Sequence, residues 1–321
     1  MVDIKLIQGD CLEKMQDIQD SSIDLTVTSP PYDNLRTYNG NNALWGEHVW
    51  KAAIKDLYRV TKDGGVVVWV VADATIKGSE TGTSFRQALW AMECGFRLHD
   101  TMIYAKNNYM PLTHNRYEQA FEFMFVWAKG RPKTFNPIMI PSLTAGTKKN
   151  RGGSNKAKEA TYAERKRDEW TTVKPTKQHP NIFYYDVGKN DKTEHNAPFP
   201  EALAHDHIIS WSNEGDTVFD PFMGSGTTGK MAKLLNRNFI GIELDEGYFK
   251  IAQDRINQAV VNTNKRMGRS DGTSRKDYDA YCVGSKCMGG RWHEAAPGCG
   301  RDWELSEFYG YCGIAGKCGV E

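Results

Sequence analysis

The amino-acid sequence predicts an α/β protein built on a doubly wound, mostly parallel sheet. Strand-like and helix-like segments alternate through most of the 321 residues. The apolar run VVVWVVA at 66–72 is typical of a central parallel strand that is buried on both faces. Two loops of unusual composition, at 28–32 and 220–229, each follow a strand-like segment directly. In open sheets of this class, ligands bind where such strands end.

The N-terminal half contains alternating strand and helix patterns. Ile23, Leu25 and Val27 alternate with smaller or polar residues, which is typical of a short buried strand. Val49, Ala53 and Leu57 recur at helical spacing, which indicates a helix. The same patterns predict strands at 5–8, 23–28, 66–72, 96–106 and 120–129, and helices at 11–18, 44–60 and 83–93.

The composition changes after residue 143. From 144 to 178, Gly, Lys, Asn and Thr dominate and the apolar period is lost, which predicts a loop-like insertion. Periodic patterns return after a short aromatic segment, and they predict strands at 216–219 and 238–242 and helices at 199–210, 230–235 and 246–260. We therefore divide the chain into a first half of the main domain, an insertion, a second half and a C-terminal appendage, at 1–143, 144–196, 197–262 and 263–321.

The charge of the chain is balanced overall but unevenly distributed. The chain has 41 Lys and Arg against 40 Asp and Glu, so the net charge of +1 does not by itself indicate a nucleic-acid partner. The segment 148–177 has ten Lys and Arg against four Asp and Glu, which predicts a basic arm on a mildly acidic body. No apolar run is long enough to span a membrane, so we expect a soluble, cytoplasmic protein without a membrane partner.

The first unusual loop is Ser29-Pro30-Pro31-Tyr32. Pro31 keeps Pro30 out of the helical region, and neither proline has an N–H group, so the loop is stiff and extended. The Ser29 hydroxyl and the loop carbonyls can accept hydrogen bonds beside the flat ring of Tyr32. This combination suits a planar group that carries an exocyclic amine. The alternative is a simple turn with Tyr32 in the core.

The second unusual loop contains Gly224, Gly226 and Gly229 in a G-x-G-x-x-G pattern between a predicted strand and a predicted helix. Glu243 ends the next predicted strand, where an acid can bind ribose hydroxyls. The glycines alone fit a nicotinamide-dependent dehydrogenase or a tight turn with an unrelated acid. A dehydrogenase leaves the Ser-Pro-Pro-Tyr loop without a role.

Together, these motifs resemble the amino-DNA methyltransferases that use S-adenosylmethionine. The resemblance rests on TSPPY at 28–32, DPFMGSGTTG at 220–229, GDCL at 9–12 and APFPEAL at 197–203. The catalytic motif precedes the cofactor motif, an order that resembles the β group of the family. The likeness covers roughly 3–143 and 180–260, and it implies a Rossmann-like, seven-stranded-type sheet with an inserted target-recognition region. Asn196 departs from the pattern, where the family leads us to expect proline.

The resemblance also implies roles for individual residues. The catalytic residues would be Ser29, Pro30, Pro31 and Tyr32. The residues that bind S-adenosylmethionine would be Asp10, Cys11, Pro198, Phe199, Asp220, Phe222, Gly224, Ser225, Gly226, Thr227 and Glu243. Asp10 can equally cap the helix predicted at 11–18, and Phe222 can equally be a core residue.

The expected substrate is double-stranded DNA, from which the target base must be flipped out. Within the resembling family, serine at the first position of the catalytic motif goes mostly with cytosine N4, whereas a carboxylate goes mostly with adenine N6. Ser29 therefore favours cytosine N4, with adenine N6 as the alternative. A methyltransferase acting on RNA or on a protein amide, and a catalytically silent DNA-binding module, are the more distant alternatives.

Five of the seven cysteines lie in the last forty residues. Cys282, Cys287, Cys312 and Cys318 form two close pairs that could hold a structural zinc ion. The alternative is a Gly-rich appendage with free thiols. The sequence does not indicate an oligomeric state.

Overall fold

The computed structural model describes residues 2–31, 45–109, 115–150, 170–186 and 200–260. All of these residues belong to one compact unit, Met1–Ser285. A second unit, Lys286–Glu321, lies outside the described residues, as do the four cysteines predicted to bind zinc. No helix in the described ranges has the length and apolarity that a membrane crossing requires.

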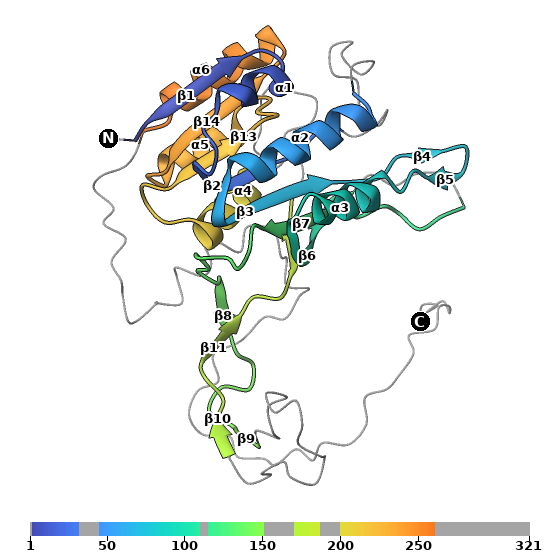
Figure 1. Cartoon of the computed structure of the whole chain (residues 1–321). Coiled ribbons are helices and arrows are strands. Elements are labelled where there is room, and N and C mark those ends of the chain that lie inside the picture. The colour runs from blue at the N-terminus through green and yellow to red at the C-terminus, as the bar shows by residue number, and fades with distance from the viewer. Residues whose placement is uncertain (1, 32–44, 110–114, 151–169, 187–199, 261–321) are drawn as a thin grey trace, which may run out of the picture. The chain divides into compact units, whose positions relative to one another are not determined.

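An eight-stranded sheet forms the centre of the structure, in the order β1-β14-β13-β2-β3-β7-β6-β12 (Figure 1). Every neighbouring pair is parallel except for the two pairs that involve β7, so β7 alone points the opposite way. The strands are β1 (Ile4–Gln8), β2 (Ile23–Thr28), β3 (Thr61–Val71), β6 (Arg97–Lys106), β7 (Phe121–Ala128), β12 (Ile182–Tyr185), β13 (Thr217–Asp220) and β14 (Asn238–Glu243).

The mostly parallel sheet confirms the predicted fold class, with two differences. The sheet has eight strands because the aromatic segment at 181–186 forms β12, which pairs with β6 in parallel. The run at 66–72 lies in β3, which is central and buried on both faces as predicted. However, β3 is parallel to β2 on one side and antiparallel to β7 on the other.

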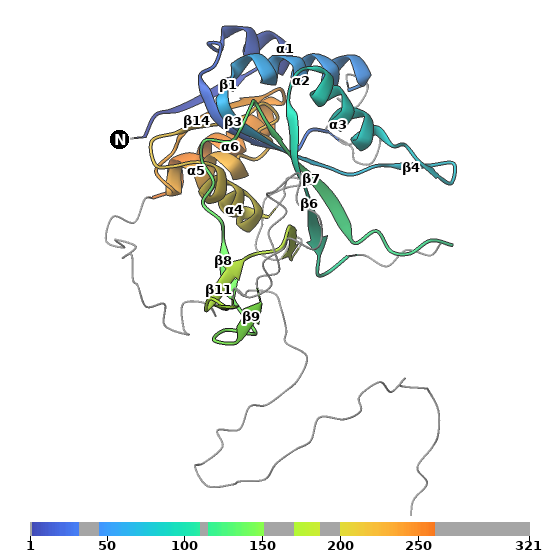
Figure 2. The same ribbon diagram turned by 60° about the horizontal axis from the view of Figure 1, so that its bottom comes forward.

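Helices cover the sheet in two layers (Figures 1 and 2). One layer contains α1 (Cys11–Lys14), the 3-10 turn η1 (Met15–Asp17), α2 (Glu47–Val60) and α3 (Thr83–Glu93), and the other contains α4 (Glu201–Trp211), α5 (Thr227–Leu234) and α6 (Glu246–Gln258). Alternate residues of β3 explain both layers, because Val68 packs in the core beneath α4–α6 and Trp69 packs in the core beneath α1–α3. Trp69 stacks on Trp127, and both are fully buried.

Several predicted boundaries differ from the observed ones. The helix predicted at 44–60 begins at Glu47, and the helix predicted at 230–235 begins earlier, at Thr227. The helix predicted at 11–18 is divided into α1 and the 3-10 turn η1. The loop predicted at 144–178 contains strands of two short antiparallel hairpins. These pair β8 (Met139–Pro141) with β11 (Thr176–Gln178) and β9 (Lys148–Asn150) with β10 (Trp170–Thr172). A third hairpin, β4 (Thr75–Ile76) with β5 (Ser79–Glu80), follows β3.

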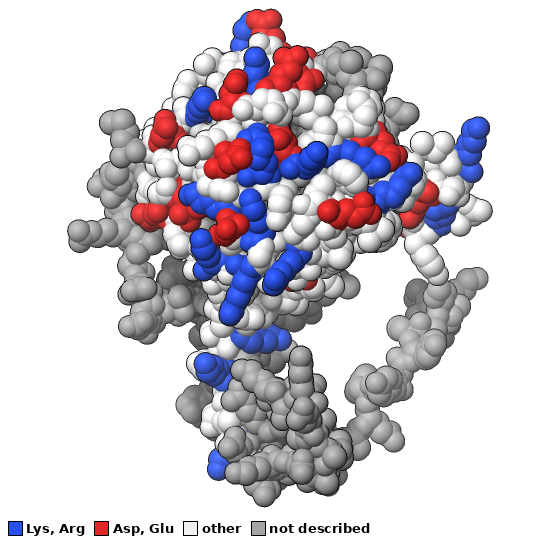
Figure 3. Space-filling view, viewed as in Figure 1, with Lys and Arg blue, Asp and Glu red and all other residues white. Residues whose placement is uncertain are grey.

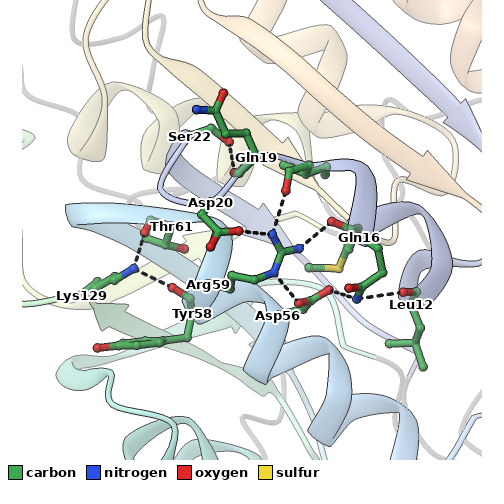
Figure 4. Close-up of polar contacts among 12 residues, drawn as sticks. Leu12, Gln16, Gln19, Asp20, Ser22, Asp56, Tyr58, Arg59, Thr61 and Lys129 are labelled. Carbon is green, nitrogen blue, oxygen red and sulfur yellow. Dashed lines mark hydrogen bonds and ion pairs between the residues drawn. The ribbon is translucent and has the colours of Figure 1, made fainter.

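A polar cluster around Arg59 fastens η1 to α2 (Figure 4). The Arg59 guanidinium donates to the backbone oxygens of Met15 at 2.7 Å and Ile18 at 2.8 Å. It also pairs with the carboxylates of Asp56 at 2.8 Å and Asp20 at 2.5 Å. Arg59 lies two residues before β3 begins, so this cluster stabilises the amino edge of the sheet. The carboxyl edge carries the two motif loops.

Candidate active site

The two motif loops leave neighbouring strands at the same edge of the sheet. Ser29 follows β2 directly, and Asp220 is the last residue of β13, which pairs with β2 in parallel. The chain then turns in opposite directions, because α5 leads from β13 to β14 on one face and α2 leads towards β3 on the other (Figure 1). Such a reversal opens a crevice at the carboxyl ends of the strands, where ligands bind in open α/β sheets.

Hydrogen bonds join the two motifs across this reversal. The Thr28 hydroxyl donates to the Asp220 carboxylate at 2.7 Å, and both residues are buried. The Thr228 hydroxyl, at the start of α5, donates to the Val27 carbonyl at 3.1 Å. The Ser-Pro-Pro-Tyr loop and the glycine-rich loop are therefore joined to each other at this edge of the sheet.

Asp220 has an unusual protonation equilibrium. Burial raises the pKa of its carboxyl from 3.8 to about 7, and the nearby Glu243 charge adds to this rise. Hydrogen bonds from the Thr28 hydroxyl at 2.7 Å and the Phe222 amide at 3.1 Å act in the opposite direction and lower the pKa of Asp220. Asp220 is therefore a buried acid that titrates close to neutrality, at the junction of the two motifs.

Glu243 shapes the glycine-rich turn from the end of β14. One carboxylate oxygen accepts the Gly224 amide at 2.7 Å, and the other accepts the Asp245 amide at 2.8 Å. Burial is the main cause that raises the pKa of Glu243. A carboxylate has about four lone-pair positions, so these two bonds leave capacity for two further donors. This capacity fits a ligand that presents paired hydroxyl groups, such as a ribose.

The three glycines of the G-x-G-x-x-G pattern have different physical roles. Gly224 and Gly226 have φ values of +53° and +81°, in the left-handed region that favours glycine. A Cβ on Gly226 would lie 2.9 Å from the Ala252 side chain, and a Cβ on Gly229 would lie 2.5 Å from the Ile256 side chain. Gly226 and Gly229 therefore let α5 pack closely against α6.

Phe222 lies in an aromatic cluster beside the turn. Its ring is 5.5 Å from Trp45 and 6.1 Å from Trp69, with edge-to-face geometry in both pairs. The Trp45 indole N–H is buried and has no hydrogen-bond partner within the part of the chain that the structure describes. Phe222 and Trp45 pack against the core beneath α1–α3, so this cluster fits the core alternative for Phe222 as well as an aromatic wall for the predicted cofactor.

The segment that begins at Gly9 lies next to Glu243. The Gly9 amide donates to the Glu243 carbonyl at 2.9 Å. The Asp10 carboxylate accepts the Leu12 amide at 2.7 Å and caps α1, which confirms the capping alternative. Burial first, and then the Asp10 charge, raise the pKa of Cys11 to about 12. Cys11 therefore lies at the site as a neutral thiol, and its contact with a cofactor stays a prediction.

Arg255 on α6 is a site residue that the sequence analysis missed. Its guanidinium donates to both the carbonyl and the hydroxyl of Ser225 at 2.8 Å, and it lies 3.4 Å from the Thr227 hydroxyl. Ser225 and Thr227 are buried, and a buried polar turn needs donors and acceptors from elsewhere. The polar residues in the glycine-rich turn could have indicated that a hydrogen-bond donor from elsewhere is needed. They do not indicate that this donor is Arg255.

The remaining predicted residues divide into two groups. Pro30 is buried, and Ser29 and Pro31 are partly exposed where β2 ends. Tyr32, Pro198 and Phe199 lie outside the described residues, so their stacking and closing roles stay predictions. No cluster of three or more His, Cys, Asp or Glu side chains suited to a metal ion occurs in the described ranges.

Comparison with known proteins identifies the family. A family model described as DNA methylase, of the N6/N4 methyltransferase type, matches residues 23–254. The chain belongs to this family. The orphan methyltransferase M.BamHII of Bacillus amyloliquefaciens is 49% identical over 266 residues, which cover 78% of this chain and 95% of that protein. These findings confirm the resemblance drawn from the motifs and exclude the dehydrogenase alternative.

Solved structures agree with this membership. The structure of the M1.HpyAVI–SAM complex is 26% identical, with a TM-score of 0.53, and the match covers 79% of this chain and 99% of that one. The PvuII DNA methyltransferase, described as cytosine-N4-specific, is 19% identical with a TM-score of 0.59. The match covers 87% of this chain and 91% of the PvuII chain. At that identity, the PvuII enzyme supports the fold alone. This chain is thus a DNA methyltransferase with the Rossmann-like sheet that its sequence predicted.

Proposed function

We propose that this methyltransferase transfers a methyl group from S-adenosylmethionine to N4 of a cytosine flipped out of double-stranded DNA. The observation that carries the proposal is the 2.7 Å hydrogen bond between Thr28 and Asp220. It joins the loop suited to an exocyclic amine to the loop suited to the methyl donor. One crevice can then hold both reactants at reacting distance, which is a large part of catalysis.

The acceptor side of the reaction is assigned to Ser29 and Pro30. An exocyclic amine is a poor nucleophile because its lone pair is conjugated with the ring. The Ser29 hydroxyl and the Pro30 carbonyl accept the two amino hydrogens and draw the nitrogen towards tetrahedral geometry. The nitrogen would then attack the methyl carbon as the carbon–sulfur bond breaks, with S-adenosylhomocysteine as the leaving group, and the extra proton on the nitrogen would pass to water. Preorganised acceptors of this kind need no reorganisation at the moment of reaction.

The donor side is assigned to the turn after β13 and to Glu243. Bound S-adenosylmethionine supplies an activated methyl group on a sulfonium. Glu243 retains acceptor capacity for ribose hydroxyls, and the aromatic cluster of Phe222 and Trp45 offers a wall for the adenine. Asp10, Cys11, Pro198 and Phe199 complete the proposed cofactor site, as the family resemblance implies.

Recognition of DNA is assigned to the insertion 144–196. Acidic and basic side chains are intermixed over the visible face of the main body (Figure 3). The hairpin segments 139–150 and 170–182 contain no Asp or Glu, whereas Lys148, Lys149, Lys174 and Lys177 lie exposed on them. Exposed lysines on segments that contain no acidic residue suit contacts with phosphates. Once a base is flipped out, Tyr32 would stack on it.

Product analysis tests this proposal. Unmodified duplex DNA is incubated with the full chain and S-adenosylmethionine, digested to nucleosides and separated by mass spectrometry. Parallel samples contain single-stranded DNA or RNA, and Asp220→Ala protein controls for contaminating activity. We expect N4-methylcytosine from duplex DNA. N6-methyladenine as the sole product would overturn the assignment to cytosine, and methylation of RNA alone would overturn the assignment to DNA.

A further inference from the structure

The three helices on one face of the sheet meet at a single carboxylate. Glu201 is the first residue of α4, and its Oε1 atom lies 2.5 Å from Lys230 on α5 and 3.1 Å from Arg255 on α6. The Arg255 side chain is 15% exposed, whereas the Glu201 side chain is 38% exposed. The pair is therefore partly buried, and salt screens a partly buried pair less than a fully exposed one.

Arg255 uses its two terminal nitrogens for different partners. Nη2 binds Glu201, and Nη1 binds the carbonyl and the hydroxyl of Ser225. Ser225 lies between Gly224 and Gly226, in the middle of the turn that follows β13, and it is 2% exposed. The planar guanidinium presents its donors in a rigid fork, so Glu201 on one side fixes the direction of the donor on the other.

The turn also has fixed points of its own. The Met223 amide donates to the Ile242 carbonyl at 2.9 Å, the Gly224 amide donates to Glu243 at 2.7 Å, and the Gly226 amide donates across Ser225 to the Met223 carbonyl at 2.9 Å. Arg255 on α6 adds a hold on the carbonyl and the hydroxyl of Ser225 itself. With glycine on both sides, the backbone at Ser225 has more conformational freedom when that hold is lost.

We propose that Arg255 is a positioning residue for the cofactor, which acts through Ser225, and that Glu201 orients Arg255. The network ties the turn to the start of α4, which follows the Pro198-Phe199 segment in the sequence. This inference rests on the proposed cofactor site and adds a residue to its support. A turn that holds the donor equally in the ground state and the transition state affects the cofactor KM rather than kcat.

A purely structural role for Arg255 makes a different prediction. It would lower thermal stability when lost, without a selective effect on the cofactor. The chain offers a matched control in Lys233, which donates from α5 to the α6 backbone oxygens of Ile256 at 2.7 Å and Asn257 at 3.1 Å. Lys233 therefore joins the same two helices but binds no residue of the turn.

The experiment compares Arg255→Met, Arg255→Lys, Glu201→Gln and Lys233→Met in the full chain. Calorimetry with S-adenosylmethionine should show about tenfold weaker binding for Arg255→Met, a smaller loss for Arg255→Lys and Glu201→Gln, and wild-type affinity for Lys233→Met. In assays with saturating DNA, Arg255→Met should raise the cofactor KM and leave kcat within about twofold. If Arg255→Met does not fold, Arg255→Lys carries the same comparison.

A second measurement separates this inference from the proposed function. Amide hydrogen exchange of the cofactor-free protein should be faster across 221–227 in Arg255→Met than in wild type, and unchanged there in Lys233→Met. Unchanged exchange in this turn, or equal loss of cofactor affinity in Arg255→Met and Lys233→Met, would overturn the positioning role. If the exchange differences between the variants and wild type are as expected, but wild-type protein does not bind S-adenosylmethionine, the result would instead overturn the proposed cofactor.

Discussion

At the scale of single residues, two buried groups give the stability opposite dependences on pH. The folded-state pKa of Asp220 is raised from 3.8 to about 7, mainly by burial. Its contribution to stability is complete below pH 4 and is lost as pH rises through about 7. Burial lowers the pKa of His207 from 6.5 to about 4. Its contribution is complete above pH 6.5 and is lost as pH falls towards 4.

Asp220→Asn should isolate the Asp220 contribution, because wild type and variant share the His207 contribution. Asparagine cannot ionise, so the loss of stability that Asp220 causes in wild type between pH 4 and pH 7 does not occur in the variant. The free energy of unfolding of wild type relative to Asp220→Asn should therefore fall across this interval. Urea unfolding of the cofactor-free proteins at half-unit steps of pH measures the difference. A difference that is constant from pH 4 to pH 8 would show that Asp220 titrates as an ordinary carboxyl.

Two threonines on β2 provide a matched pair for the bond that joins the motifs. Thr28 and Thr26 are both fully buried, but Thr28 donates to Asp220, whereas the Thr26 hydroxyl has no hydrogen-bond partner among the described residues. Thr28→Val should destabilise the protein by about 1–3 kcal/mol because it leaves a buried acceptor unsatisfied. Thr26→Val should be neutral or stabilising. Denaturant titration measures both, and equal losses would argue against a special role for the Thr28–Asp220 bond.

At the scale of elements, Arg59 is the main polar link between η1 and α2. Arg59→Met removes four hydrogen bonds at a partly buried site, and it should lower the free energy of unfolding by about 1.5–3 kcal/mol. The cluster contains none of the proposed site residues, so kcat at a temperature where the variant is folded should stay unchanged. Lys250→Met removes an exposed pair with Glu246 and should have no measurable effect on stability. A large loss of kcat in Arg59→Met would contradict the separation of the two edges.

The sequence predicted elements best where one local pattern decides them. The bounds of β2 and α3 match the predictions, since alternation or helical spacing fills each element. The hairpin of β8 with β11 was missed because its strands have three residues each and pair across more than thirty positions. The site shows the same contrast. Its motif residues were predicted because each motif is a continuous local pattern, whereas Arg255 was not predicted. Its partner Ser225 lies 30 residues away, and no local pattern connects the two.

At the scale of the whole molecule, the strand order assembles one site from distant parts of the chain. The strands β1, β14, β13 and β2 are neighbours in the sheet, although they lie near opposite ends of the sequence. Their carboxyl ends carry Asp10, Glu243, Asp220 and Ser29. The proposed cofactor site therefore depends on the complete parallel half of the sheet, and a truncation that removes β1 should weaken it.

The basic hairpins should govern the salt dependence of DNA binding. Lys148, Lys149, Lys174 and Lys177 are exposed, and each lost phosphate contact changes the slope of log K against log salt by about 0.9. Replacing all four by alanine should flatten that slope by about 3 if most of them contact phosphate. Fluorescence anisotropy with duplex DNA at several salt concentrations measures the slope, with Lys250→Ala as the control. An unchanged slope would remove the hairpins from the DNA interface.

The proposed cofactor site is formed by the ends of four neighbouring strands, β1, β14, β13 and β2. Amide hydrogen exchange of the full chain, measured with and without saturating S-adenosylmethionine, tests it most directly. We expect slower exchange with cofactor in peptides that cover 9–12, 27–31, 221–228 and 243–245, and unchanged exchange in β6 and β12. Protection that is confined to β6 and β12, or that omits the peptides after β13 and β14, would contradict the account.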